Sequence, residues 1–171
     1  MGRRNIELKA RLHERDKALE VCRGLGATLE GDIHQVDTYF PVPEGRFKLR
    51  HSDPGDDYLV FYRRADVSGP KGCDYHLAVV DDSTLAVLRA ALGVVGVVEK
   101  TRTLYLWDKV RIHLDRVDDL GDFIEFEAVL SEDEADEDGF RKLAHLQQAF
   151  GIVPDDLVEV SYLELLLARS R

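Results

Sequence analysis

Two glutamates, Glu125 and Glu127, lie two positions apart in segment 121–127, which alternates in the manner of a β-strand. Successive strand side chains point to opposite faces, so the two carboxylates share one face while Ile124 and Phe126 share the other. Two carboxylates this close repel each other unless a metal ion, basic side chains or water compensates their charge. The sequence therefore predicts a strand with one apolar face and one acidic face.

The same alternation of apolar and charged residues recurs in other segments. The apolar faces carry Ile6 and Leu8, Phe47 and Leu49, Ile112 and Leu114. The charged faces carry Asn5, Glu7 and Lys9, Arg46, Lys48 and Arg50, Lys100 and Arg102, and Arg111, His113 and Asp115. An antiparallel sheet with one wet face is the ordinary interpretation of such a pattern. The alternative is a closed barrel, and long charged groups in place of Ser and Thr favour it.

A barrel closed with its apolar face outward would hold these charges inside. Burying ions costs on the order of several kcal/mol each even after relaxation, so such an interior is expected to be water-filled and built for a charged ligand. Clustered bases suit the oxygens of a polyphosphate, which Arg binds in bidentate fashion. The carboxylates suit Mg²⁺ or Mn²⁺, which prefer oxygen ligands.

The elements that would position these groups are short and joined by turns. Strands are predicted at 5–9, 28–40, 46–50, 58–63, 74–80, 97–107, 109–117 and from Gly121 onward. Helices are predicted at 16–25, from Asp82, from Ser131 and at 161–168. Leu85, Leu88, Ala91 and Leu92 form the apolar stripe of the second helix, and Phe140, Leu143, Leu146 and Phe150 that of the third. The short turns imply antiparallel pairing, hence an α+β fold with about eight strands in a single domain over 1–171.

Composition narrows the function classes. The chain has 171 residues, of which 44% are hydrophobic and 33% charged, with a formal net charge of -10. An excess of negative charge argues against general nucleic-acid binding, which depends on phosphate contacts. No segment approaches the ~20 apolar residues that a membrane span needs, and no signal peptide is expected. Cys22 and Cys73 are expected to be free thiols in a reducing cytoplasm. The oligomeric state is left open, with a homodimer as one alternative.

Taken in order, the motifs resemble those of the CYTH superfamily of triphosphate tunnel metalloenzymes. The similarity is greatest to class IV adenylyl cyclases, with thiamine triphosphatases and tripolyphosphatases as relatives. The family pattern Glu-x-Glu-x-Lys corresponds to Asn5-Ile6-Glu7-Leu8-Lys9. The later segments that carry the resemblance are 46–50, 99–102, 113–115, 120–125 and 161–166.

The resemblance implies an eight-stranded antiparallel tunnel, with helices packed outside, that binds a triphosphate together with Mg²⁺ or Mn²⁺. By position, the metal ligands would be Asn5, Glu7, Glu125 and Glu127. The substrate-binding residues would be Lys48, Arg50, Lys100, Arg102 and His113. The catalytic residues would be Lys9, Arg63 and Asp115.

Two positions depart from the family pattern. Asn5 replaces a glutamate, and an amide oxygen coordinates a metal without contributing charge. Arg63 replaces a residue that is commonly lysine. The implied activity is the conversion of ATP to cyclic AMP and pyrophosphate. Two alternatives stay open. One is hydrolysis of the terminal phosphate of thiamine triphosphate or tripolyphosphate. The other is triphosphate binding without turnover, in which case Asn5 would mark the loss of catalysis.

Overall fold

The computed structural model describes residues 3–64, 67, 69–131 and 134–170. Its strands are β1 (Arg3–Arg11), β2 (Thr28–Phe40), β3 (Arg46–Asp53), β4 (Asp57–Arg64), β5 (Lys71–Val80), β6 (Gly96–Trp107), β7 (Val110–Val117) and β8 (Gly121–Leu130). Its helices are α1 (Arg15–Gly24), α2 (Asp82–Leu92), α3 (Asp136–Ala149) and α4 (Tyr162–Arg169), with a short 3₁₀ turn, η1 (Pro154–Asp156), before α4.

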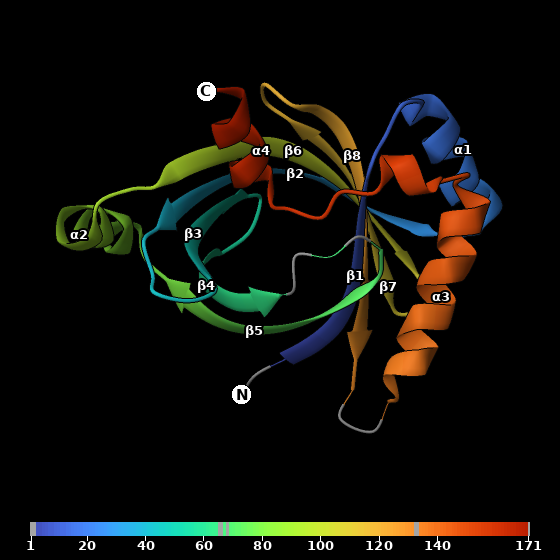
Figure 1. Cartoon of the computed structure of the whole chain (residues 1–171), viewed down its shortest axis with the longest axis horizontal. Helices are drawn as coiled ribbons and strands as arrows, with labels where there is room; N and C mark the ends of the chain where they lie inside the picture. Colours follow the sequence, from blue (N-terminus) through green and yellow to red (C-terminus); the bar gives the residue numbers. More distant parts are fainter. Residues whose placement is uncertain (1–2, 65–66, 68, 132–133, 171) are drawn as a thin grey trace.

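The strands close into a barrel in the order β1-β5-β4-β3-β2-β6-β7-β8, and each neighbouring pair is antiparallel. Figure 1 looks into this ring of strands, with α1 and α3 on one side and α2 on the other. Closure removes the exposed edges that an open sheet would present. The prediction of an eight-stranded antiparallel barrel with helices outside is confirmed.

The main apolar core lies outside the barrel wall, under α1 and α3. It joins the outward residues of β1, β7 and β8 to the helices. Leu143 and Leu146 of α3 are fully buried there, and each such burial contributes roughly 1.5–3 kcal/mol. Gly139 lets α3 approach closely, since a Cβ at this position would meet Cγ1 of Ile6 at 2.7 Å. This packing fixes β1 and β8 with their charged residues facing inward.

Helix α4 lies at one end of the barrel, where a second core gathers Tyr39, Val98 and Phe123 around Tyr162 and Leu163. Ser161 caps α4: its hydroxyl oxygen accepts from the Glu164 backbone N–H, while the Glu164 carboxylate accepts from the Ser161 backbone N–H. A Cβ at Gly96 would meet Leu163 at 2.5 Å, so the glycine admits the helix to β6. These contacts bring the first residues of α4 to the barrel interior.

Some sequence predictions differ from the structure in detail. Phe140, expected to face inward, is 39% exposed, because the neighbouring Gly139 makes the close contact with β1. The apolar stripe predicted for α2 buries none of its residues. Helix α3 begins at Asp136, and part of its predicted start, at positions 132 and 133, lies outside the described residues. In the described part of the chain, none of the helices has the length and apolarity required to cross a membrane.

Candidate functional site

The barrel encloses a cavity of about 360 Å³, called the tunnel from here on. Among the described residues, seven basic and four acidic side chains line it, although the whole chain carries a net charge of -10. The basic residues are Lys9, Lys48, Arg50, Lys71, Lys100, Arg102 and Arg111, and the acidic ones are Glu7, Asp37, Glu125 and Glu127. The protein therefore concentrates positive charge inside an acidic molecule, which favours an anionic ligand.

The first basic group comes from β3 and is organised by Asp37 of β2. Lys48 Nζ lies 2.7 Å from Oδ2 of Asp37, and Arg50 donates to both of its carboxylate oxygens at 2.7 Å. Burial alone would raise the pKa of Asp37, but the charges of Arg50 and Lys48 hold it well below its usual range. Burial and the Arg50 charge lower the pKa of Lys48 to about 7, although Asp37 opposes them. Lys48 thus gains or loses its proton near neutrality.

The second basic group comes from β6 and is organised by Asp115 of β7, which is fully buried. Lys100 donates to Oδ2 of Asp115 at 2.8 Å, and Arg102 donates to both oxygens at 2.7 Å. Tyr162 adds a hydrogen bond of 3.0 Å from α4. Burial raises the pKa of Asp115, but the charges of Arg102 and Lys100 outweigh it and keep the carboxylate ionised. Asp115, which is buried in the barrel wall, therefore holds Lys100 and Arg102 in position.

The acidic side of the tunnel comes from β1 and β8. Glu125 accepts from Arg102 at 2.8 Å and lies 3.5 Å from Lys9 Nζ. Burial raises the pKa of Glu125, but the positive charges of Lys9, Lys100 and Arg102 lower it well below its usual range. Glu127 accepts from Asn5 Nδ2 at 2.5 Å and from Arg111 at 3.3 Å. In the ring order, β8 lies opposite β3, so carboxylates and bases face each other across the tunnel.

His113 of β7 lies between these groups. Its Nδ1 is 3.6 Å from Glu125 and its Nε2 is 3.9 Å from Glu127. Burial and the nearby Arg102 lower the pKa of His113, so the imidazole is mainly neutral at neutral pH. His113 therefore does not add a further cation to the tunnel, and its buried Nδ1 has no hydrogen-bond partner among the described residues.

The donor set for a divalent cation is found where β1 meets β8. Glu7 and Glu127 occupy opposite positions on these two strands, and Asn5 is two positions from Glu7. The amide oxygen of Asn5 is buried without a hydrogen-bond partner, while its nitrogen donates to Glu127. Carboxylate and amide oxygens fit Mg²⁺ or Mn²⁺. The described residues contain no preassembled group of three or more His, Cys, Asp or Glu ligands, so a cation would compete with the ion pairs already present.

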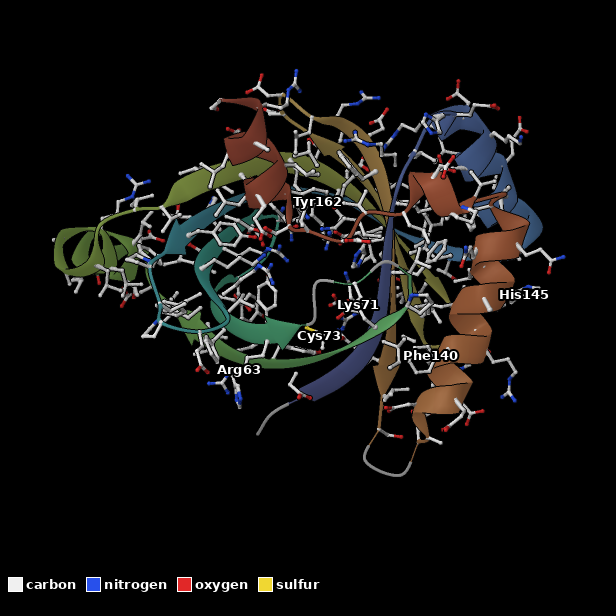
Figure 2. All side chains as sticks on the ribbon, viewed as in Figure 1. Arg63, Lys71, Cys73, Phe140, His145 and Tyr162 are labelled. Carbon is white, nitrogen blue, oxygen red and sulfur yellow. The ribbon has the colours of Figure 1, made fainter. Side chains whose placement is uncertain are left out.

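Arg63, which the sequence assigned to catalysis, lies outside the tunnel. Its side chain is 65% exposed, and it contacts the Phe61 ring on the outer face of β4. Figure 2 shows Arg63 on the outside of the ring of strands, with Lys71 and Cys73 directed toward its interior. The inward residue at this point of β4 is Tyr62, which pairs across the sheet with Tyr75. The structure therefore does not bring Arg63 to the tunnel with the other predicted site residues.

Several tunnel residues were not assigned from the sequence. Asp37 and Gln35 belong to β2, whose alternation could have placed them inward. Lys71 lies between the strands predicted at 58–63 and 74–80, and its Nζ donates to the carbonyl oxygens of Val67 and Glu159 at 2.8 Å each. Tyr162 comes from a helix, and only the packing of α4 against the barrel end brings it to Asp115.

One part of the tunnel wall is apolar and aromatic. Apart from Lys71, the residues of β4 and β5 that line the tunnel are Val60, Tyr62, Cys73, Tyr75 and Leu77. Ile33 of β2 and Leu104 of β6 also line the tunnel. Gln35, two positions from Ile33, is buried and its side-chain oxygen has no hydrogen-bond partner. The tunnel thus combines a charged section with a section suited to an organic group.

The protein is thus a closed antiparallel barrel whose interior pairs bases with carboxylates. The family model for the CYTH domain matches residues 3–162. This chain therefore belongs to the CYTH domain family.

One curated relative and two solved structures illustrate what else this chain is similar to. The chain is 24% identical over 169 residues to a Methanocaldococcus jannaschii protein named "Putative adenylate cyclase", covering 94% of this chain and 97% of that protein. A Pyrococcus horikoshii structure is 24% identical with a TM-score of 0.78, covering 94% and 98% of the two chains. A Hippeastrum structure is 16% identical with a TM-score of 0.64, covering 97% and 95%; it is described as a "putative adenylyl cyclase" with a dominant triphosphatase activity.

Proposed function

We propose that this protein is a divalent-metal-dependent enzyme that acts on a triphosphate inside the tunnel, with ATP cyclisation as its reaction. The observation that carries the proposal is that four bases, two from β3 and two from β6, line one cavity together with the carboxylates of β1 and β8. Several bases in one closed cavity match a chain of phosphates, whereas a single phosphate needs only one or two. The chain's family supports the same substrate class.

In this proposal the basic residues bind and orient the phosphates. Arg50 and Arg102 are fixed by their carboxylate partners, so their guanidinium groups lose little freedom when a phosphate binds. The barrel wall and α4 limit water around the reacting phosphorus. Asn5, Glu7 and Glu127 would hold the cation, with Glu125 nearby. When bound, Mg²⁺ or Mn²⁺ would neutralise phosphate charge and polarise the reacting phosphoryl group.

For cyclisation, the ribose 3′-hydroxyl oxygen bonds to the α-phosphorus and the bond to the β-phosphate oxygen breaks, releasing pyrophosphate. The hydroxyl proton must leave, and Lys48 Nζ is an amine in the tunnel whose pKa of about 7 allows it to hold or release a proton near neutrality. The apolar and aromatic section around Val60 and Leu77 supports a substrate with an organic group over inorganic tripolyphosphate.

Hydrolysis of the terminal phosphate is the second candidate. It is favoured by the Hippeastrum structure, which is described as having a dominant triphosphatase activity. The same bases and carboxylates would serve it, with water as the nucleophile in place of the ribose hydroxyl. Asn5 favours neither reaction by its geometry, since its side chain reaches the carboxylates and not the apolar section.

Product identification distinguishes these reactions. The protein is incubated with ATP, thiamine triphosphate or tripolyphosphate in the presence of Mg²⁺ or Mn²⁺, and products are identified by chromatography and phosphorus NMR. Cyclic AMP with pyrophosphate supports cyclisation; ADP with orthophosphate assigns hydrolysis instead. Binding of all three compounds with no product under either metal would contradict the enzyme proposal. The Arg63→Ala variant, altered outside the tunnel, is the matched control for side-chain removal.

A further inference from the structure

One buried polar side chain of the tunnel is not explained by phosphate or metal binding. Gln35 of β2 is 6% exposed and lines the tunnel. Its Oε1 atom is buried and has no hydrogen-bond partner in the part of the chain that the structure describes. Buried polar atoms of native proteins are nearly always paired, because an unpaired one costs desolvation energy. An unpaired acceptor in the wall of a ligand cavity therefore indicates a donor on the ligand.

The neighbours of Gln35 in the sheet do not supply this donor. In the strand register, Gln35 lies opposite Lys100 of β6 and Ser52 of β3, and neither bonds to its Oε1. The Lys100 ammonium is directed to Asp115, to which it donates at 2.8 Å. The next inward residue of β2 is Asp37, whose depressed pKa keeps it an ionised carboxylate, and such a group only accepts. The donor is therefore expected on the substrate.

Phosphates and the cation are poor partners for this oxygen. Phosphate groups present acceptor oxygens, and an amide oxygen is an acceptor as well. In the ring order, β2 is four strands from β1 in either direction, so Gln35 lies on the wall opposite Asn5 and Glu7, the proposed cation ligands. The donor that pairs with Oε1 is thus expected in the organic part of the substrate.

The position of Gln35 along β2 indicates which organic group it meets. Two positions away in one direction, about 7 Å along the strand, lies Asp37, which holds the bases of β3. Two positions away in the other direction lies Ile33, which lines the apolar section. The antiparallel strand β6 changes in the same direction, from Arg102 to Leu104. In a nucleoside triphosphate, the ribose occupies the corresponding place, because it joins the phosphates to the base.

We propose that Gln35 is a specificity-determining residue whose Oε1 accepts a hydrogen bond from a ribose hydroxyl of the substrate. The inference rests on the proposed function, since it requires that the bases of the tunnel bind a triphosphate. It adds that the substrate is a ribonucleoside triphosphate. Thiamine triphosphate and tripolyphosphate have no sugar hydroxyl, and a buried acceptor left unpaired discriminates against ligands that lack the matching donor.

The test compares ATP with 2′-deoxy-ATP, 3′-deoxy-ATP, GTP and tripolyphosphate by calorimetric titration. Divalent metal is omitted, so that the proposed metal-dependent reaction does not run. The wild-type protein is expected to bind ATP about three- to tenfold more tightly than at least one of the two deoxy analogues. In Gln35→Leu, ATP and both analogues are expected to bind with equal affinity, while tripolyphosphate binds as in wild type.

The matched control is Gln148→Leu, the same substitution at an exposed position of α3, which is expected to keep the wild-type discrimination. Tripolyphosphate that binds to a wild-type protein without preference for ATP over either analogue overturns this inference alone, as does discrimination that survives in Gln35→Leu. A change confined to the preference for ATP over GTP contradicts the ribose contact and assigns Gln35 to the base. A wild-type protein that binds neither ATP nor tripolyphosphate overturns the proposed function as well.

Urea unfolding separates this role from a structural one. Because Oε1 of Gln35 has no partner in the described part of the protein, Gln35→Leu removes no such hydrogen bond and relieves an unpaired buried oxygen. The variant is therefore expected to unfold at the same urea concentration as wild type or at a higher one. A clear loss of stability together with weaker tripolyphosphate binding would show that Gln35 supports the barrel, and would overturn the inference.

Discussion

The hydroxyl of Tyr162 donates a hydrogen bond of 3.0 Å to Oδ2 of Asp115, which lies 47 positions earlier in the chain. The same carboxylate accepts from Lys100 and Arg102, so the first residue of α4 is tied to the second basic group of the tunnel. The ring of Tyr162 also lies 4.1 Å from Lys9 Nζ. Tyr162 therefore links the helix that covers the end of the barrel to the bases that line the tunnel.

Replacing Tyr162 with Phe is expected to lower both stability and triphosphate affinity. The change removes a hydrogen bond from a fully buried carboxylate, which costs roughly 1–3 kcal/mol of unfolding free energy. Urea unfolding and calorimetric titration with tripolyphosphate measure the two effects. Tyr105→Phe is the control, because Tyr105 is equally buried but packs in the core outside the barrel. Affinity unchanged in Tyr162→Phe would show that α4 does not position the bases.

Glu125→Ala is expected to abolish metal-dependent activity while the protein stays folded. Glu125 accepts from Arg102 beside Lys9, and loss of one such charge-stabilising group typically costs about 10²–10³ in rate. The rate is measured as a function of Mn²⁺ concentration. The control is Glu99→Ala, at a position that is 50% exposed and paired with His34. Near-normal turnover of Glu125→Ala at limiting metal would remove Glu125 from the site.

The low pKa of Lys48 gives stability a specific pH dependence. Its pKa is about 7 in the folded protein and about 10.4 in an unfolded chain, so unfolding takes up a proton between these values. Stability rises with pH wherever the unfolded state binds more protons. The unfolding free energy of wild type relative to Lys48→Met is therefore expected to rise from about pH 7 toward pH 10. A difference that stays flat over this pH range would contradict the shifted pKa of Lys48.

Asn5→Glu is expected to tighten Mn²⁺ binding by roughly an order of magnitude, since charged oxygens bind hard cations better than an amide does. Without metal, the new carboxylate faces Glu127 in place of the present hydrogen bond, so the variant is expected to be less stable than wild type. Calorimetry with Mn²⁺ and thermal unfolding with and without metal measure both effects.

Asn5→Gln is the matched control for Asn5→Glu, because the glutamine side chain is as long as that of glutamate but carries no charge. Unchanged Mn²⁺ affinity in the glutamate variant would mean that β1 does not supply the metal site. Tighter binding combined with slower turnover would mean that Asn5 is adapted to another substrate, which favours hydrolysis over cyclisation.

Much of the barrel could be predicted because alternation encodes which face a residue occupies. The charged positions of β1, β3, β6, β7 and β8 line the tunnel or are buried in its wall, as the pattern at Glu125 and Glu127 indicates. Arg46 is the exception, since it pairs with Glu164 of α4. The period of a strand is two, so an error of one position reverses the face. Arg63 was assigned by motif, whereas the register of β4 places Tyr62 inside.

Other tunnel residues depend on tertiary structure and carry no local signal. Tyr162 has the pattern of an ordinary helix start, and its role follows from the contact between Leu163 and Gly96 that seats α4 on β6. The apolar stripe predicted for α2 likewise buries none of its residues, because sequence periodicity shows that a face is apolar but not what covers it.

Calorimetric titration of Arg50→Ala and Arg63→Ala tests the tunnel as a triphosphate site most directly. The two arginines lie on neighbouring strands, one bound to Asp37 inside the tunnel and one exposed outside. Tripolyphosphate and orthophosphate are titrated with Mg²⁺ present, and circular dichroism checks folding. Arg50→Ala is expected to lose far more affinity for tripolyphosphate than for orthophosphate, and Arg63→Ala to match wild type. Equal losses for both anions in Arg50→Ala, or equal losses in both variants, would contradict a triphosphate-binding tunnel.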